Sequence, residues 1–314
     1  MEGSAPGFGQ LLPDEVRAAC AWVAGQSRSV SIDQAALAAY AETLPPTPDL
    51  QPPDPRTELV SGDRESRAAF TICLDAINFG SGWWPTIRKR PGHSGYATIA
   101  AAVVERFREY GPWTCEELGG IERDRLAFDL EQNAEHPLMA EYARALRDVG
   151  AHVGGEYGGS FAAVADAGRS AAGLAELLAE WDAFADASSY ENRRVPFFKR
   201  AQIAAADVAR GGVAPYRDLH RLTAFADNLV PHTLRMAGVL RYDDGLAGRI
   251  AAGELLEVGE PAEVEIRACG VHAVELVAAA AGQSPAAVDQ QLWQRGQSAE
   301  VKAQPRHRCR TTWY

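Results

Sequence analysis

Apolar residues recur along most of this chain at spacings of three and four positions, which is the period of an amphipathic α-helix. Alanine is abundant and β-branched residues are scattered, so the composition also favours helices over strands. The pattern predicts an all-α fold with at most a few short strands. The expected helices cover residues 13–25, 31–42, 65–79, 95–110, 122–132, 136–149, 170–186, 197–210, 216–226, 231–240, 243–251, 262–281 and 284–294.

Start and stop signals sharpen some of these boundaries. Ser31 followed by Gln34 is a capping-box pattern, which predicts that one helix begins there. Ser284 followed by Pro285 is typical of another helix start. The stretch "PPTPDLQPPDP" at 45–55 holds six prolines, so it must be extended. It is either a linker or an arm laid across the surface.

Two further stretches are expected to lie outside the helices. The residues "GGEYGGS" at 154–160 predict a loop, and they lack the GxGxxG spacing of a dinucleotide site. The final residues "RHRCRTTWY" at 306–314 alternate basic and apolar groups, which is the pattern of a short strand. Their aromatic end is expected to dock on the rest of the protein.

Composition and charge limit the classes of function. The chain has 314 residues, 46% of them hydrophobic, which is enough for a sizeable core. Its net charge is −11, so its surface repels phosphate polymers, and we expect no polymeric nucleic acid as a partner. A single nucleotide in a small basic pocket is still compatible with this charge. No apolar stretch approaches the roughly 18–20 residues that span a bilayer, so we expect no membrane partner.

The cysteines and histidines indicate neither a disulfide framework nor a metal site. The five cysteines are widely spaced without a CxxC pair, and we interpret them as reduced thiols in a cytoplasmic protein. The first residues, "MEGSAPGFGQ", lack the basic and apolar regions of a signal peptide. No HExxH, GxxxxGK[ST] or GxSxG motif occurs. We therefore expect no metal and no cofactor, and a chemistry based on carboxylates, lysine and aromatic side chains.

Two charged residues stand where a charge costs free energy unless it has a partner or a task. Asp227, in "TAFADNLVP", precedes Pro231, which suits the first turn of a helix and predicts a bend at 226–230. Asp227 is either a helix-end charge or a carboxylate that points into a cleft. Lys199 follows two phenylalanines in "FFKRAQ". Its stem either lies along an amphipathic helix or places the ammonium group in the cleft.

Seven segments, in family order from about residue 70 to the end, resemble the queuosine salvage protein family. They are "LDAINFGSGWW" (74–84), "GYATIAAAV" (95–103), "YGGSF" (157–161), "VPFFKRAQIAAADV" (195–208), "LTAFADNLVPHTLRMAGVLRY" (222–242), "EVEIRACGVHAVELV" (263–277) and "RHRCRTTWY" (306–314). Two features depart from the family. The stretch "INFGSGWW" carries two glycines where the motif is usually fuller, and His272 stands where many relatives have a bulky aromatic residue.

The resemblance implies a metal-free N-glycosylase that releases queuine from queuosine 5′-monophosphate. It also implies an all-helical, two-lobed fold similar to that of helix–hairpin–helix DNA glycosylases, although this chain shows no glycine-rich hairpin of the kind that grips duplex DNA. On this view residues 1–314 form a single catalytic unit. Its expected parts are N-terminal helices with the proline-rich arm (1–60), an N-terminal lobe (61–190) and a C-terminal lobe with the catalytic segments (191–314).

The implied reaction assigns roles to the two charged residues. Cleavage of a ribosyl C1′–N9 bond passes through an oxocarbenium-like state, which a fixed carboxylate such as Asp227 stabilises while it orients water. Lys199 is expected to pair with Asp227, to contact the 5′-phosphate or to assist the water. Queuine is a 7-deazaguanine, so protonation at position 7 cannot help the base to leave. The sugar cation therefore has to be stabilised more strongly, which raises the demand on Asp227.

The resemblance also gives candidates for substrate binding. They are Asp75, Asn78, Phe79, Trp83, Trp84, Phe225, His232, Arg235, Glu265 and Arg267. Asp75 and Asn78 are three apart on one expected helix, and we expect one of them to contact the base edge or the cationic side arm of queuine, unless they form a surface stripe. One of Phe79, Trp83 and Trp84 is expected to stack on the base, and core packing is the alternative for each.

The remaining candidates are charged residues with two open interpretations. Glu265 and Arg267 precede a long apolar stretch, where a buried charge needs either an internal ion pair or a ligand. The 5′-phosphate has four candidate partners: Lys199, Arg200, His232 and Arg235.

Two rival functions belong to other classes. One is a non-catalytic helical module that binds a modified nucleoside or a protein partner. The other is a DNA glycosylase, which would bind duplex DNA in a salt-dependent manner.

Overall fold

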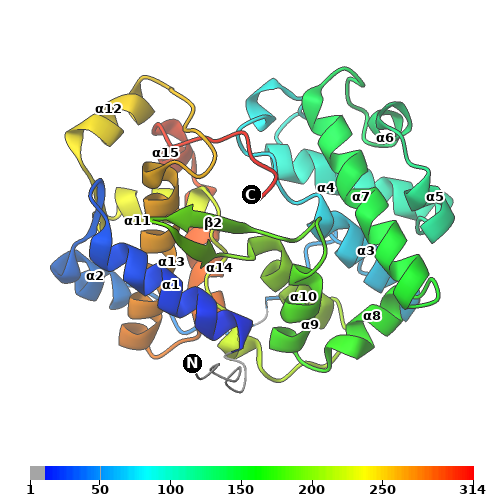
Figure 1. The fold of residues 1–314 in the computed structure, drawn as a ribbon, viewed down its shortest axis with the longest axis horizontal. Coiled ribbons are helices and arrows are strands. Elements are labelled where there is room, and N and C mark those ends of the chain that lie inside the picture. The colour runs from blue at the N-terminus through cyan, green and yellow to red at the C-terminus, as the bar shows by residue number, and fades with distance from the viewer. Residues whose placement is uncertain (1–10, 50) are drawn as a thin grey trace, which may run out of the picture.

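The computed structural model describes residues 11–49 and 51–314, and it is mostly helical (Figure 1). The α-helices are α1 (Leu12–Gln26), α2 (Gln34–Ala41), α3 (Arg64–Ala76), α4 (Gly95–Tyr110), α5 (Cys115–Gly119), α6 (Arg123–Asp129), α7 (Pro137–Glu156), α8 (Phe161–Gly168), α9 (Ala171–Ala179), α10 (Lys199–Arg210), α11 (Leu229–Met236), α12 (Asp244–Ala251), α13 (Pro261–Ala281), α14 (Pro285–Gly296) and α15 (Ala299–Ala303). Two short 3₁₀ helices are η1 (Trp84–Thr86) and η2 (Leu219–Arg221).

The strands form two small antiparallel pairs. β1 (Val30–Ile32) pairs with β4 (Leu240–Tyr242), and β2 (Ala187–Tyr190) pairs with β3 (Arg193–Pro196) in a hairpin. The prediction of an all-α fold with a few short strands is confirmed. No helix within 11–49 and 51–314 combines the length and the apolar character needed to cross a membrane. The expectation about a signal peptide concerns residues 1–10, which lie outside the described residues.

The helices form two groups (Figure 1). In the first group α7 packs against α3, α5 and α6, and α10 packs on α3 and α9. In the second group α13 is the central helix, and α1, α2, α11 and α14 pack around it. Almost the whole first half of α13 is buried, because apolar residues such as Ile266 and Val271 face neighbours on several sides. The earliest helices thus pack with the latest ones, and the pairing of β1 with β4 ties them together.

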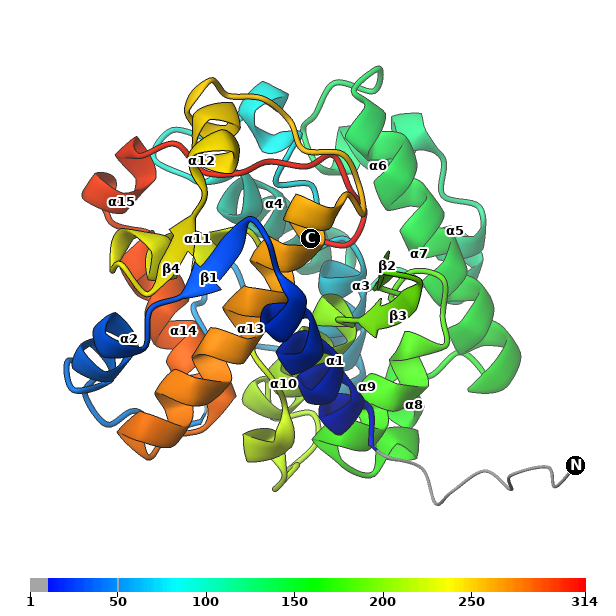
Figure 2. The same cartoon turned by 60° about the vertical axis from the view of Figure 1, so that its left-hand side comes forward.

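The C-terminal segment crosses between the two groups (Figure 2). The Gly80 amide donates to the Tyr314 backbone oxygen at 2.9 Å, and Gly82 lies so close to the Cys309 carbonyl that a side chain would collide with it. Gly80 also has a φ of +109°, a conformation that favours glycine. These contacts explain the two glycines in "INFGSGWW". The strand expected at 306–314 is reduced to one bridge, between Leu256 and Cys309.

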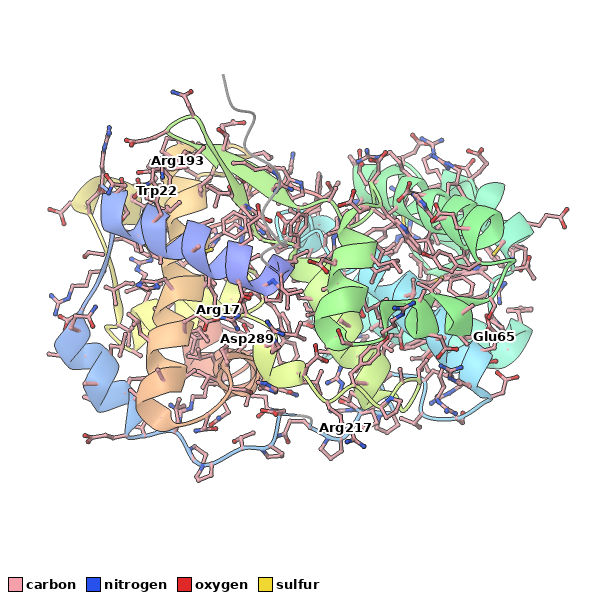
Figure 3. The ribbon with its side chains drawn as sticks, turned by 60° about the horizontal axis from the view of Figure 1, so that its bottom comes forward. Arg17, Trp22, Glu65, Arg193, Arg217 and Asp289 are labelled. Atoms are coloured by element: carbon pink, nitrogen blue, oxygen red, sulfur yellow. The ribbon has the colours of Figure 1, made fainter. Side chains whose placement is uncertain are left out.

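The proline-rich stretch 45–55 is non-helical, as expected, and its contacts are those of an arm. The Thr47 amide donates to Gln283, the Ser284 hydroxyl donates to Asp49, and Arg108 donates to the Pro55 carbonyl. Figure 3 shows this stretch running along the lower edge of the molecule. The described part of the arm therefore links the second helix group to α4 of the first.

The prediction of a helix at 216–226 is wrong. Only η2 forms there, and residues 222–227 have no regular secondary structure. Side chains from other elements take the backbone groups that a helix would use: Arg17 binds the carbonyls of Arg221 and Leu222, and Gln202 accepts from the Thr223 amide. Tertiary hydrogen bonds thus replace the helical ones.

Other differences concern helix ends. Ser31 belongs to β1, and Asp33 caps α2 by accepting from the Ala36 amide, so the predicted capping box is wrong. α7 continues through Glu156, so the stretch 154–160 begins as helix. The expected helix at 170–186 ends at Ala179, and the short helices α5, α8 and α15 were not expected. The start signal at Ser284 is confirmed, because its hydroxyl accepts from the Ala287 amide.

Candidate active site

Asp227 lies between an extended segment and α11. Its Oδ1 accepts from the amides of Leu229 and Val230, both at 2.8 Å. Val230 is therefore helical, and the bend expected at 226–230 ends two residues earlier than predicted, with Pro231 inside the first turn. Within the described residues Oδ2 makes no hydrogen bond. Asp227 is thus a helix cap through one oxygen, while the other oxygen is available to a ligand.

Lys199 is the first residue of α10, and only 5% of its surface is exposed. Its Nζ donates to the Asn78 carbonyl at 2.9 Å and reaches the Asn78 Oδ1 at 3.5 Å. Burial lowers the pKa of Lys199 from 10.5 to about 8, and the negative charge of Asp227 opposes this shift. The ammonium group therefore lies near the catalytic candidate Asp227, at the end of α3.

The backbone before Lys199 is fixed in an unusual conformation. Phe198 has a φ of +47°, which is rare for a side chain of this size. The Asp186 carbonyl accepts from the amides of Phe197 and Phe198, both at 3.0 Å. The Asp186 carboxylate also accepts from the Lys199 amide at 3.2 Å. Asp186 thereby sets the position from which Lys199 enters the site.

Asp289 is a third titratable group at the site, and the sequence analysis missed it. It comes from α14, is 4% exposed, and its Oδ1 accepts from the Phe225 amide at 2.9 Å. Figure 3 shows it in the interior, among the helices of the second group. Burial, followed by the charge of Asp227, raises its pKa well above the usual value. Its place on the buried stripe with Pro285, Val288 and Leu292 is a signal that the sequence carried.

Asp75 and Asn78 extend the site along α3. Asp75 is buried, its Oδ1 accepts from the Asn78 amide group at 3.3 Å, and its Oδ2 has no partner among the described residues. Burial, followed by the charge of Asp207 on α10, raises the pKa of Asp75 well above its usual value. The carboxylates of Asp75 and Asp207 line a small cavity. Pro53 of the arm and Glu58, which follows it, help to close this cavity. Asp207 and Glu58 also pair with Arg210, at 2.8 and 3.2 Å.

The aromatic candidates differ in accessibility. Phe79 is 0% exposed, and its ring packs against Tyr142, so no face of it is free to stack on a base. Trp83 and Trp84 are half-buried, and the Trp84 indole nitrogen donates to Tyr142. Phe225 is half-buried beside Asp227 in the chain.

Glu265 and Arg267 have internal partners. The Glu265 carboxylate accepts from the amides of Ser29 and Val30 and from the Tyr190 hydroxyl. Arg267 is 0% exposed and binds both oxygens of Asp186, at 3.0 and 2.6 Å. Its Nε donates to the Ala226 carbonyl at 3.1 Å. Arg267 thus forms an internal ion pair, whereas Glu265 is held by amides and a hydroxyl and forms no ion pair with the described residues.

The four phosphate candidates are also separated. Arg200 is buried between the rings of Phe79 and Phe184 and donates to the Ala76 carbonyl, so it points into the core of the first group. Arg235 lies over the ring of Tyr242. His232 is buried, with Nε2 at 3.0 Å from the Val301 carbonyl. Of the four, Lys199 alone contacts Asn78, whose side chain donates to Asp75.

The electrostatics of the site suit a developing positive charge. The charge of Lys199 acts on the carboxyl groups of Asp75, Asp227 and Asp289 and lowers the pKa of each, against the effect of burial. Burial also raises the pKa of Asp227, while Lys199 and the two amide hydrogen bonds oppose that shift. In the described part of the chain, no three His, Cys, Asp or Glu side chains converge as they would around a metal ion.

Fold and site together define an all-helical protein in which carboxylates and a lysine meet at the junction of two helix groups. Comparison with known proteins identifies the family. Residues 59–314 match the family described as "Queuosine salvage protein", and the chain belongs to it.

Several curated relatives are similar over most of their length. The chain is 36% identical to the "Queuosine 5′-phosphate N-glycosylase/hydrolase" of Sphaerobacter thermophilus, an alignment that covers 93% of this chain and 95% of the relative. It is 30% identical to proteins of the same name from Mus musculus, covering 96% and 99%, and Bos taurus, covering 86% and 84%.

Proposed function

We propose that this chain is an N-glycoside hydrolase that releases queuine from queuosine 5′-monophosphate. The name shared by the curated relatives supports the reaction. The single observation that carries the proposal is the Asp227 carboxylate, which has one oxygen fixed by two amides and the other without a partner in the described chain. A carboxylate held in this way can face a sugar cation without rearranging during the reaction.

The reaction consists of bond cleavage, attack by water and proton transfer to the base. The C1′–N9 bond breaks and its electron pair leaves with the base, while Asp227 stabilises the cationic sugar. A water oxygen then bonds to C1′, and its proton passes to the Asp227 carboxylate. Asp227 gives this proton up through solvent and the departed base anion takes up one proton, giving queuine and ribose 5-phosphate. Lys199 stabilises Asp227 in its ionised form, because the two charges attract each other.

The remaining contacts of the base are assigned on chemical grounds. The unpartnered Oδ2 of Asp75 suits the secondary ammonium of the queuine side arm, because a buried carboxylate oxygen needs a donor. Asn78, which already contacts both Asp75 and Lys199, orients that carboxylate. Trp83, Trp84 and Phe225 are the half-buried aromatic residues available to stack on the base.

The proposal treats the substrate as a free nucleotide, with no polymeric nucleic acid or membrane as a partner. The net charge of −11 supports this, because an acidic surface repels duplex DNA and anionic lipid. All five cysteines are free thiols in the structure, which fits the reducing cytoplasm. The division at residues 60 and 190, and the likeness to DNA glycosylases, remain predictions.

The test is to incubate the purified protein with queuosine 5′-monophosphate and to detect free queuine by mass spectrometry. We expect release by the wild-type protein and almost none by Asp227→Asn. A wild-type protein that binds the nucleotide without releasing queuine would support the non-catalytic module instead. Cleavage of a base from duplex DNA, with salt-dependent binding, would support the DNA glycosylase.

A further inference from the structure

A strip of unpaired positive charges adjoins the site, which is unusual in so acidic a chain. Most described arginines pair with a carboxylate or a backbone carbonyl, as Arg17, Arg64 and Arg90 do. Several of the exceptions lie on the segments 88–89 and 302–310, whereas others, such as Arg217, lie elsewhere. Six side chains on these two segments make no hydrogen bond or ion pair with the described residues: Arg88, Lys89, Lys302, Arg306, Arg308 and Arg310. We call these six residues the basic strip.

The stretch after α3 that leads to residues 88–89 contacts the C-terminal stretch that follows Lys302, and the two run in opposite directions. Tyr314 accepts from Gly80, Cys309 contacts Gly82, and the charge of Lys89 acts on Lys302. Burial, followed by the positive charges of Arg306 and Lys89, lowers the pKa of Lys302. Like charges that are brought together without a counter-charge destabilise a folded protein. Such an arrangement therefore indicates an anionic ligand.

Arg306 is the member of the strip nearest to the proposed catalytic carboxylate. It is half-buried, and its Nε is buried without a partner among the described residues. Burial lowers the pKa of Arg306, and the charge of Asp227 opposes this shift, so the two side chains lie within electrostatic reach. The chain also contacts this region directly, because the Asn228 side chain donates to the His307 carbonyl at 3.4 Å. Arg306 therefore stands beside the start of α11.

Two buried imidazoles adjacent to Arg306 supply a second, independent observation. His232 and His307 are each 1% exposed. Both ring nitrogens of His307, and Nδ1 of His232, have no partner among the described residues. Burial, followed by the charges of His232 and Arg306, lowers the pKa of His307 to about 3. Since buried polar atoms normally have partners, these unused nitrogens indicate a polar ligand that approaches from the Arg306 side.

We propose that Arg306 binds the 5′-phosphate of the substrate, and that the rest of the basic strip draws the nucleotide into the site. This assignment rests on the function proposed above and adds a residue that was not among the phosphate candidates from the sequence. A guanidinium group matches two phosphate oxygens with parallel hydrogen bonds, and Arg306 has its donors free. The anomeric carbon and the 5′-phosphate of one ribose are a few bonds apart, which fits neighbouring contacts to Asp227 and Arg306.

The test measures binding of ribose 5-phosphate by calorimetry, with ribose as the unphosphorylated probe. We expect the wild-type protein to prefer ribose 5-phosphate and Arg306→Ala to lose about 10- to 100-fold in affinity for it, while binding of ribose is unchanged. Arg306→Lys should retain part of the affinity, because it keeps the charge and loses the paired geometry. Arg306 makes no internal bond, so its removal should leave the thermal unfolding temperature unchanged.

Arg217→Ala is the matched control. Arg217 is an exposed arginine without a partner in the described chain, and Figure 3 shows it at the lower edge of the molecule. Both alanine variants remove one positive charge, so an equal loss in both would overturn the assignment in favour of a general field effect. Wild-type affinity in Arg306→Ala, or no preference of the wild-type protein for the phosphorylated sugar, would also overturn it. Because binding is measured without turnover, a failure of this inference is distinct from a failure to release queuine.

Discussion

Two pairs of opposite charge in the described chain, Arg267–Asp186 and Lys199–Asp227, lie next to each other and differ in how completely they are satisfied. Arg267 and Asp186 form two hydrogen bonds with each other, and their spare groups bind the Ala226 carbonyl and the Lys199 amide. Lys199 and Asp227 attract each other without a hydrogen bond between them. The oxygen of Asp227 that does not cap α11 has no partner in the described chain.

This difference separates a framework from a site. The Arg267–Asp186 pair uses its hydrogen bonds to fix the backbone next to both Asp227 and Lys199, so it sets their relative position. Both side chains of this pair are 0% exposed, so the pair offers a substrate no accessible surface. In the Lys199–Asp227 pair, the Oδ2 atom of Asp227 has no partner in the described chain, so it can bind a ligand. We therefore expect changes in the first pair to alter stability and changes in the second to alter rate.

The largest effect is expected from breaking the framework pair. Arg267→Leu leaves the Asp186 carboxylate buried and unpaired, and we expect the free energy of unfolding to fall by about 3–5 kcal/mol. Urea denaturation measures this loss. The control is Arg28→Leu, which breaks an exposed ion pair with Glu191 and should cost about 1 kcal/mol or less. Equal losses in the two variants would contradict the distinction between framework and surface pairs.

Asp227→Asn should produce the second largest effect, and on rate alone. Asparagine keeps an oxygen that can accept from the Leu229 and Val230 amides, so the cap and the unfolding free energy should change little. The lost negative charge should lower kcat by about 10²–10³. Steady-state kinetics and denaturation on the same preparation measure both quantities. A destabilised variant with unchanged kcat would reduce Asp227 to a structural cap.

Lys199 should give a smaller effect with a characteristic dependence on pH. Its pKa of about 8 means that the ammonium charge is present below pH 8 and is lost as the pH rises above it. We expect kcat/KM to decline in the same direction, and Lys199→Met to lower it by about 10- to 100-fold at neutral pH. Lys199→Arg keeps its charge at high pH, so any activity it retains should persist above pH 8. An alkaline decline that is identical in Lys199→Arg would assign it to another group.

Local patterns were sufficient for much of the fold. The helices around Ser284 and along 95–110 were predicted because their caps and apolar stripes lie within a few residues of each other. The segment 216–226 was wrong because its conformation depends on Arg17 and Gln202, which reach it from distant elements. No local pattern contains that information.

In the site, too, the sequence was informative about single residues and uninformative about contacts between distant elements. Asp227, Lys199 and Asp75 were proposed from family resemblance, and the structure brings them together, although their roles are still to be tested. Arg267 could not be assigned from the sequence, because the choice between ligand and ion pair depends on Asp186, far away in the chain. Arg306 was missed since an isolated arginine in a basic tail looks solvated until its buried surroundings are known.

The smallest effect should come from Asp289→Asn, which tests how two neighbouring carboxylates divide their roles. Burial and the charge of Asp227 raise the pKa of Asp289 well above its usual value, so we expect Asp289 to be the one of the two that holds a proton. An asparagine has the shape of a protonated aspartate and can still accept from the Phe225 amide. We expect kcat/KM to stay within a few-fold of wild type, whereas Asp289→Leu should cost about 1–3 kcal/mol of stability because that amide loses its partner. A loss in Asp289→Asn as large as that in Asp227→Asn would mean that Asp289 itself gives or takes a proton in the reaction, and the two residues would then form one catalytic pair.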